Sequence, residues 1–206
     1  MAEQPFRDWL TEKTWVQGVR YSRAVAWLLP PAALVVDAPF LALDPASWPP
    51  GFAWLLAWQV TAEIFFLGVV AADRWVPRVR GREWAVHLAC VGAMLLATWI
   101  GVADAWRLGD LSIYAAGSTF VAAVMCTARP VRRPMYVLSL LALAWPAWER
   151  TGDVAMCLSA LVNPFCVVTL CMALDRFTYS RNLELFTETR RAEAERARAD
   201  KVLYNV

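Results

Sequence analysis

Hydrophobic residues are gathered into six long windows along the chain, separated by short polar or proline-containing segments. The windows cover residues 24–43, 52–72, 84–104, 111–128, 135–148 and 154–174. Most are close to the ~20 residues that an α-helix needs to cross a bilayer, and the fifth is the shortest. The pattern predicts an all-α integral membrane protein whose domain of residues 24–174 contains six transmembrane helices.

The segment before the first window mixes apolar and charged positions. Between Phe6 and Tyr21 the apolar side chains are Phe6, Trp9, Leu10, Val16 and Val19. This mixture is typical of a short amphipathic helix, and aromatic side chains favour the headgroup level of a bilayer. We therefore expect residues 1–23 to form an interfacial helix on the cytoplasmic face of the membrane.

The segment after the last window, residues 175–206, is the only long polar stretch. It contains no Pro or Gly and is rich in Ala, Glu and Arg, which favour helix. A seven-residue spacing, typical of a weak coiled coil, runs through Leu185, Thr189, Ala192, Arg196, Ala199, Leu203 and Val206. We expect an unbroken helix from the sixth window into the cytoplasm, weakly paired with a second copy. A solvated helix without a partner fits the spacing equally well.

Composition agrees with a membrane location. Of the 206 residues 59% are hydrophobic and 18% are charged, which is more apolar than a soluble domain of this length. The net charge of +2 gives no reason to expect a nucleic-acid partner. The five cysteines lie in the apolar windows without metal-ligand spacing and are expected to be small buried hydrophobes.

Arginine placement predicts the orientation of the windows. Segments before the first window, between the second and third, and between the fourth and fifth are basic, and so is the tail. The alternate segments hold no basic residue (44–50), Arg107 alone and Arg150 alone. Because basic loops stay in the cytoplasm, this alternation predicts that both termini are cytoplasmic. The outer segments are too short to form an extracellular binding domain.

Polar residues inside the windows suggest a ligand pocket. A charge at mid-bilayer costs roughly 2.5–3.5 kcal/mol on insertion scales, so such groups usually face a helix-bundle interior or water. Depths counted at ~1.5 Å per residue predict a pocket open to the outer leaflet. Its candidate residues are Asp37, Glu63, Trp99, Tyr114, Thr119 and Asn163. Alternatively, these groups bond to one another and only fix helix packing.

The sixth window also contains the pair Asn163-Pro164, a candidate hinge. Proline removes a backbone hydrogen bond and bends a helix, although many transmembrane prolines are simply tolerated kinks. This window is the one joined to the polar tail. A bend there would change the direction in which the tail leaves the membrane.

The sequence contains no recognisable catalytic or metal-binding motif. It has no phosphate-binding glycine loop, no metal-ligand cluster and no nucleophile paired with a base, so we expect no catalytic or metal-binding residue and no cofactor. His87 is the only histidine, which excludes a haem held by two histidines of one chain. Lys13 and Lys201 both lie outside the windows, which excludes retinal attachment.

The final residues, AEAERARADKVLYNV, carry a family resemblance. They look like the helix that precedes the catalytic domain of bacterial class III adenylate cyclases, where an Arg/Glu/Ala-rich helix ends in a motif that Leu203, Tyr204, Asn205 and Val206 match in part. The Leu-Pro that completes the motif would follow Val206. Six spans before this helix also resemble the membrane-anchored members of that family.

The resemblance implies a membrane anchor and regulatory domain in a bacterial inner membrane, joined to a cyclase domain beyond Val206. That domain would bind ATP with Mg²⁺ or Mn²⁺ at a dimer interface and release cyclic AMP. The stretch 190–206 would be the transducer, and a hydrophobic small molecule or the bilayer itself would supply the signal. Two alternatives remain: the sensor of a histidine kinase or diguanylate cyclase, and a small transporter or passive anchor.

Overall fold

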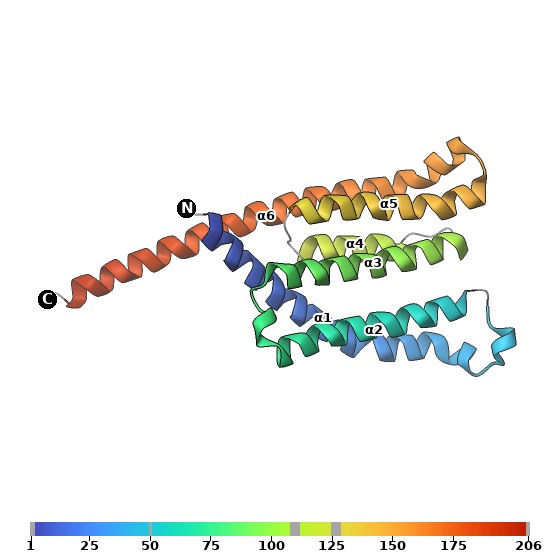
Figure 1. The fold of residues 1–206 in the computed structure, drawn as a ribbon, viewed down its shortest axis with the longest axis horizontal. Helices are drawn as coiled ribbons and strands as arrows, with labels where there is room; N and C mark the ends of the chain where they lie inside the picture. The colour runs from blue at the N-terminus through green and yellow to red at the C-terminus, as the bar shows by residue number, and fades with distance from the viewer. Residues whose placement is uncertain (1–2, 50, 108–111, 125–128, 205–206) are drawn as a thin grey trace.

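The computed structural model describes residues 3–49, 51–107, 112–124 and 129–204, and within these residues the fold is entirely helical. The α-helices are α1 (Glu3–Leu41), α2 (Phe52–Trp75), α3 (Glu83–Arg107), α4 (Ser112–Val124), α5 (Arg129–Thr151) and α6 (Val154–Tyr204). Two short 3-10 helices, η1 (Pro45–Ser47) and η2 (Pro77–Val79), lie between α1, α2 and α3. Consecutive helices alternate in direction, so the N-terminus and the free half of α6 lie at the same end of the bundle (Figure 1). We call this end the base.

Helix α1 differs from the sequence-based prediction. A separate interfacial helix ending near residue 23 was expected. Instead, α1 is one helix of 39 residues that continues through residue 23 to Leu41. It changes direction along its length: its first half crosses the base obliquely and its second half runs beside α2 (Figure 1). Pro30 and Pro31 lie inside the helix, and each lacks the N–H that an unbent helix would use.

The apolar face of the first half of α1 is covered by protein. Phe6, Leu10, Trp15 and Val19 are all buried, although most of these side chains were expected to contact lipid headgroups. Val16 keeps 48% of its surface exposed. Phe6 and Leu10 pack with Tyr179 and Phe186 of α6, whereas Trp15 and Val19, on a different side of the helix, belong to the core of the bundle. Amphipathic spacing alone cannot distinguish a lipid surface from a protein surface.

Helix α3 lies in the middle of the bundle and contacts α1, α2, α4 and α5. It presents small side chains to its neighbours, which lets their backbones approach closely, as in many membrane proteins. A Cβ atom added at Gly101 would lie 2.7 Å from the Cβ of Tyr114 in α4, and one at Gly117 of α4 would lie 2.7 Å from the Cβ of Ala97 in α3. The α3–α4 contact therefore requires glycine at both positions.

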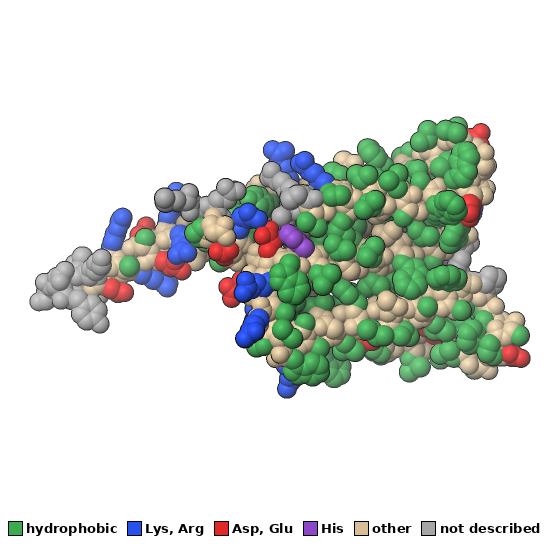
Figure 2. Space-filling model, viewed as in Figure 1, with side chains coloured by type: hydrophobic (Ala, Val, Ile, Leu, Met, Phe, Trp, Pro, Cys, Tyr) green, Lys and Arg blue, Asp and Glu red, His purple; other side chains and the backbone are tan. Residues whose placement is uncertain are grey.

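Three of the described helices are long and apolar enough to cross a membrane: Phe52–Trp75, Glu83–Trp106 and Val154–Asp200. A shorter apolar helix covers Tyr114–Val124, within the fourth predicted window, whose two ends lie outside the described residues. Helix α1 has a charged first half, and α5 begins with arginines. Hydrophobic side chains cover the visible face of the bundle, whereas charged side chains gather on the tail and around the base (Figure 2).

Helix α6 is a single helix of 51 residues that joins the sixth apolar window to the charged tail. The predicted continuity through Asp175 is confirmed. Its first half packs against α4 and α5, and its last part extends from the bundle as a free rod (Figure 1).

Candidate functional site: the junction where α6 leaves the bundle

An aromatic cluster joins the start of α1 to α6 just outside the bundle. The ring of Phe6 lies 5.5 Å from that of Tyr179 in an edge-to-face arrangement and 5.4 Å from that of Phe186. Trp9 also contacts Phe186, at 5.5 Å. Aromatic pairs at such distances contribute about 0.5–1.5 kcal/mol beyond their buried area. The cluster therefore holds α6 about one to three turns beyond Asp175, where α6 contacts α5.

A polar contact lies beside this cluster. Lys13 Nζ donates a hydrogen bond of 2.7 Å to Asn182 Oδ1, and Asn182 is 8% exposed. The same ammonium lies 4.7 Å from the centre of the Trp9 ring, a cation–π distance. Because hydrogen bonding is directional, this contact restrains the rotation of α6 about its own axis in a way that the aromatic cluster alone does not.

The first half of α1 is itself fixed to the base. Arg7 forms an ion pair of 2.9 Å with Glu83 at the start of α3. Trp15 Nε1 donates to Asp73 Oδ1 at 2.9 Å, and Arg80 contacts the same carboxylate through two hydrogen bonds. The hydrogen bond to Asp73 raises the pKa of Arg80 above its ordinary value, because it stabilises the charged guanidinium. The segment of α1 that contacts α6 is thus anchored to α2 and α3.

Immediately above the junction, α5 also contacts α6. The hydroxyl of Tyr136 donates to Asp175 Oδ2 at 3.4 Å, and both side chains are buried. Asp175 is the residue at which the charged tail was predicted to begin. In the structure it belongs to the bundle, and the free part of α6 starts only beyond Phe186.

The face that α6 buries continues directly into the predicted coiled-coil spacing. Alternating steps of four and three residues connect the buried or half-buried residues Cys157, Leu161, Pro164, Val168, Cys171, Asp175, Thr178 and Asn182. The next steps reach Leu185, Thr189, Ala192, Arg196 and Ala199, which are all exposed. We call the whole series the α6 stripe. The same side of α6 is therefore buried within the bundle in the first part of the helix and exposed in the tail.

The remaining transducer residues lie at the end of the chain. The backbone at Leu203 and Tyr204 continues α6. Asn205 and Val206 lie outside the described residues. Within the described part of the tail, every stripe position beyond Leu185 faces solvent.

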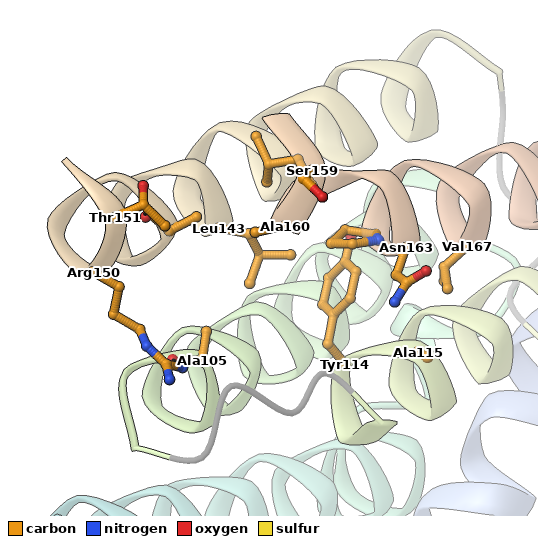
Figure 3. Close-up of a pocket in the computed structure, with 13 residues that line it drawn as sticks. Ala105, Tyr114, Ala115, Leu143, Arg150, Thr151, Ser159, Ala160, Asn163 and Val167 are labelled. Carbon is orange, nitrogen blue, oxygen red and sulfur yellow. Dashed lines mark hydrogen bonds between the residues drawn. The ribbon is translucent and has the colours of Figure 1, made fainter. Parts of the chain in front are cut away.

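A cavity of about 560 Å³ lies at the opposite end of the bundle from the base. Figure 3 shows Tyr114 and Asn163 pointing toward one another from α4 and α6, with Ser159 and Arg150 farther along. Arg150 Nη1 donates to the carbonyl of Ala105 at 3.1 Å. The described lining is Ala105, Tyr114, Ala115, Leu143, Ala147, Arg150, Thr151, Ser159, Ala160, Leu161, Asn163, Pro164 and Val167. The volume is within the roughly 300–1,000 Å³ of small-molecule sites.

The cavity contains only part of the pocket predicted from depth. Tyr114 and Asn163 line it, whereas Asp37, Glu63, Trp99 and Thr119 are absent from its described lining. Trp99 instead packs edge-to-face on Trp54 of α2, and Thr119 lies 3.9 Å from the sulfur of Cys171. The candidate hinge residue Pro164 also lines the cavity, within an α6 that stays helical there.

Asp37 and Glu63 carry buried oxygens in the other part of the bundle, on α1 and α2. Asp37 is 2% exposed, and its Oδ1 has no hydrogen-bond partner in the structure. Glu63 is half-buried and its Oε2 also has no partner. Asp37 and Glu63 were expected in the same pocket as Asn163, but the cavity around Asn163 is built from α3 to α6 and neither carboxylate is in its described lining.

The α1–α6 junction was not predicted from the sequence. Two signals pointed to it: the seven-residue spacing extends back from Leu185 to Cys157, and the tail holds the aromatic residues Tyr179 and Phe186. Among the described residues, no group of three or more His, Cys, Asp or Glu side chains could hold a metal ion. Comparison with protein-family models, curated proteins and solved structures gives no match.

Proposed function

We propose that the chain is the membrane anchor and regulatory domain of a bacterial class III adenylate cyclase, with both termini in the cytoplasm and six crossings of the inner membrane. One observation carries the proposal: α6 is a single 51-residue helix whose buried stripe continues, in the same register, into the exposed tail. A change in how α6 packs within the bundle must then reorient the tail.

The arrangement of the helices supports the number of crossings. Six helices of alternating direction return the chain to the base, where the arginines of the N-terminal segment and of the α2–α3 loop also gather. The bilayer would surround the bundle, and the base would face the cytoplasm. α1, α4 and α5 would then cross together with the three helices that are long and apolar enough by themselves.

The proposed mechanism is a population shift between two packings of α6. A hydrophobic small molecule in the Tyr114–Asn163 cavity, or a change in the bilayer, would favour one packing. The tail would pair with that of a second copy and present two catalytic domains to each other, where ATP and Mg²⁺ or Mn²⁺ would bind. A differential free energy of ~1–3 kcal/mol is enough to change output several-fold to about a hundredfold.

The test uses residues 1–206 fused to the catalytic domain of a class III cyclase. In one variant two glycines are inserted between Thr187 and Glu188, beyond the last described contact with α1 at Phe186. The matched control inserts seven helix-forming residues at the same place, which preserves both the helix and the facing of the stripe. Each chain is also made with Lys13→Ala, which loosens the junction.

We expect Lys13→Ala to change cyclic AMP production in the intact and seven-residue chains and to have no effect in the two-glycine chain. If the two-glycine chain responds to Lys13→Ala as the intact chain does, a continuous helix is not the route of the signal. If the intact chain does not respond, the junction does not regulate the output. A histidine-kinase sensor would use the same helix. The same insertions are therefore made in a fusion to a histidine-kinase domain, and the fusion whose activity responds to Lys13→Ala indicates which output the helix regulates.

A further inference from the structure

A second hollow lies between α1 and α2, on the side of the bundle away from α5 and α6. Its volume is about 600 Å³, and its described lining is Arg23, Ala26, Trp27, Pro30, Pro31, Leu67 and Val70. All of these residues except Arg23 are apolar. We call this hollow the α1–α2 groove.

The groove follows from the bend in α1. Pro30 and Pro31 lack backbone N–H groups, and the first half of the helix diverges from α2 to reach α6. Two of the lining residues, Trp27 on α1 and Leu67 on α2, are 77% and 50% exposed. The groove thus lies where the paths of the two helices separate.

An apolar hollow of this kind does not hold ordered water, because a bound water needs two to four polar partners. In the half of a membrane bundle nearer the base, the available apolar material is the acyl chain of a lipid. Ala26, Trp27, Pro30 and Pro31 of α1, with Leu67 and Val70 of α2, present an apolar surface to such a chain.

The charge in the groove lies at the end nearest the base. Of the groove residues on α1, Arg23 lies nearest the base, and α2 continues from Val70 to Arg74 at the same end. The neighbouring carboxylate Asp73 is hydrogen-bonded to Arg80 and Trp15, and Arg23 lies close enough to it for Coulombic attraction. Guanidinium groups bind phosphate through paired hydrogen bonds, and basic pockets between helices on the cytoplasmic side favour anionic headgroups.

We propose that the α1–α2 groove binds one anionic phospholipid of the cytoplasmic leaflet, with its phosphate on Arg23 and an acyl chain along Trp27, Pro30 and Leu67. This inference rests on the orientation given in the proposed function, with the base toward the cytoplasm. The lipid occupies the bend of the same helix whose first half holds Asn182 and Phe186 of α6. Its binding is therefore linked to the position of the tail.

The test measures lipid binding to the purified 206-residue chain by native mass spectrometry in detergent. The probes are phosphatidylglycerol, phosphatidylcholine with the same acyl chains, and glycerol 3-phosphate as a headgroup without chains. Arg23→Gln removes the charge in the groove. Arg176→Gln removes the same charge from an exposed position on α6 and serves as the matched control. Thermal unfolding without added lipid checks that both variants fold.

We expect the wild-type chain to bind phosphatidylglycerol roughly five-fold more tightly than phosphatidylcholine, the preference expected for one basic group at a membrane surface. Arg23→Gln should abolish this preference and Arg176→Gln should keep it.

Three outcomes would overturn the inference. They are equal binding of the two lipids by the wild-type chain, an unchanged preference in Arg23→Gln, and binding of glycerol 3-phosphate as tight as that of phosphatidylglycerol, which would indicate a free-phosphate site. The readout involves no cyclase domain. A cyclase fusion that shows no regulation would therefore leave the lipid-binding result unaffected. Likewise, a chain that binds no lipid would leave the cyclase-fusion result unaffected.

Discussion

Lys13 and Asn182 are 169 residues apart in the sequence, and a 2.7 Å hydrogen bond joins them where α6 leaves the bundle. Lys13 belongs to the part of α1 that is bonded to α2 and α3 through Trp15 and Arg7. Together with the aromatic contacts of Phe6 and Trp9, this hydrogen bond connects the emerging part of α6 to the first half of α1, and through it to α2 and α3.

Replacing either partner should loosen the junction. Asn182→Leu leaves the ammonium of Lys13 without its acceptor, and Lys13→Ala leaves the buried amide oxygen of Asn182 without a donor, so each should reduce stability by about 1–3 kcal/mol. Thermal unfolding of the two single variants and the double variant gives the coupling energy of the pair. Asn182→Asp, which keeps the acceptor, should retain wild-type stability. Strictly additive effects would show that the bond contributes nothing.

Gly101→Ala should disturb the cavity. The new Cβ would lie 2.7 Å from the Cβ of Tyr114, and overpacking of this kind costs about 1–3 kcal/mol. Gly68→Ala is the matched control, because it lies in α2 with open space around it and should be neutral or slightly stabilising. Thermal unfolding in detergent measures both. Equal melting temperatures for the two variants would mean that α3 and α4 do not approach each other as closely as described.

Tyr114→Phe should have a smaller effect in the same region. The hydroxyl of Tyr114 lies 2.7 Å from Ser139 Oγ, and Ser139 also donates to the carbonyl of Tyr136 at 2.8 Å. Removing the phenol therefore leaves Ser139 with one partner, and the expected loss is about 0.5–1.5 kcal/mol, typical of one hydrogen bond. Tyr114→Ala, which also removes the ring, should lose clearly more in the same unfolding assay.

Pairing of two tails should involve the α6 stripe. Ala199 lies on the stripe and Ala197 lies off it, and both are exposed. Under mild oxidation Ala199→Cys should form a disulfide-linked dimer on non-reducing gels several times faster than Ala197→Cys, because stripe positions face each other in a coiled coil. The wild-type chain gives the background from its native cysteines. Equal rates for the two variants would indicate tails that meet without a defined face.

The sequence predicted the course of each helix more accurately than it predicted which helices contact each other. An Ala-, Glu- and Arg-rich segment free of Pro and Gly predicted the uninterrupted course of α6 through Asp175, since these preferences act within one helix. The burial of Phe6 and Leu10 against α6 depends on Tyr179 and Phe186, which are 173 and 180 residues from Phe6 in the sequence, and the amphipathic spacing of α1 suits a lipid surface equally well.

The candidate pocket was predicted in part for a similar reason. Counting residues along a helix gives depth, and depth brought Tyr114 and Asn163 together correctly. It gives no information about which helices are neighbours around the bundle. Asp37 and Glu63 were therefore assigned to a cavity that is built from other helices. Contacts around α3, which depend on glycine and alanine at particular turns, determine that arrangement.

The length of α6 beyond the junction has a mechanical consequence. From Asn182 to Tyr204 the helix extends ~33 Å at ~1.5 Å per residue. If the junction acts as a pivot, a tilt of about 10° inside the bundle displaces the far tip by about 6 Å, the length of roughly one helical turn. At Asp175, about 10.5 Å from the pivot on the bundle side, the same tilt displaces the helix by about 2 Å, so the tip moves about three times as far as the part of α6 next to the junction.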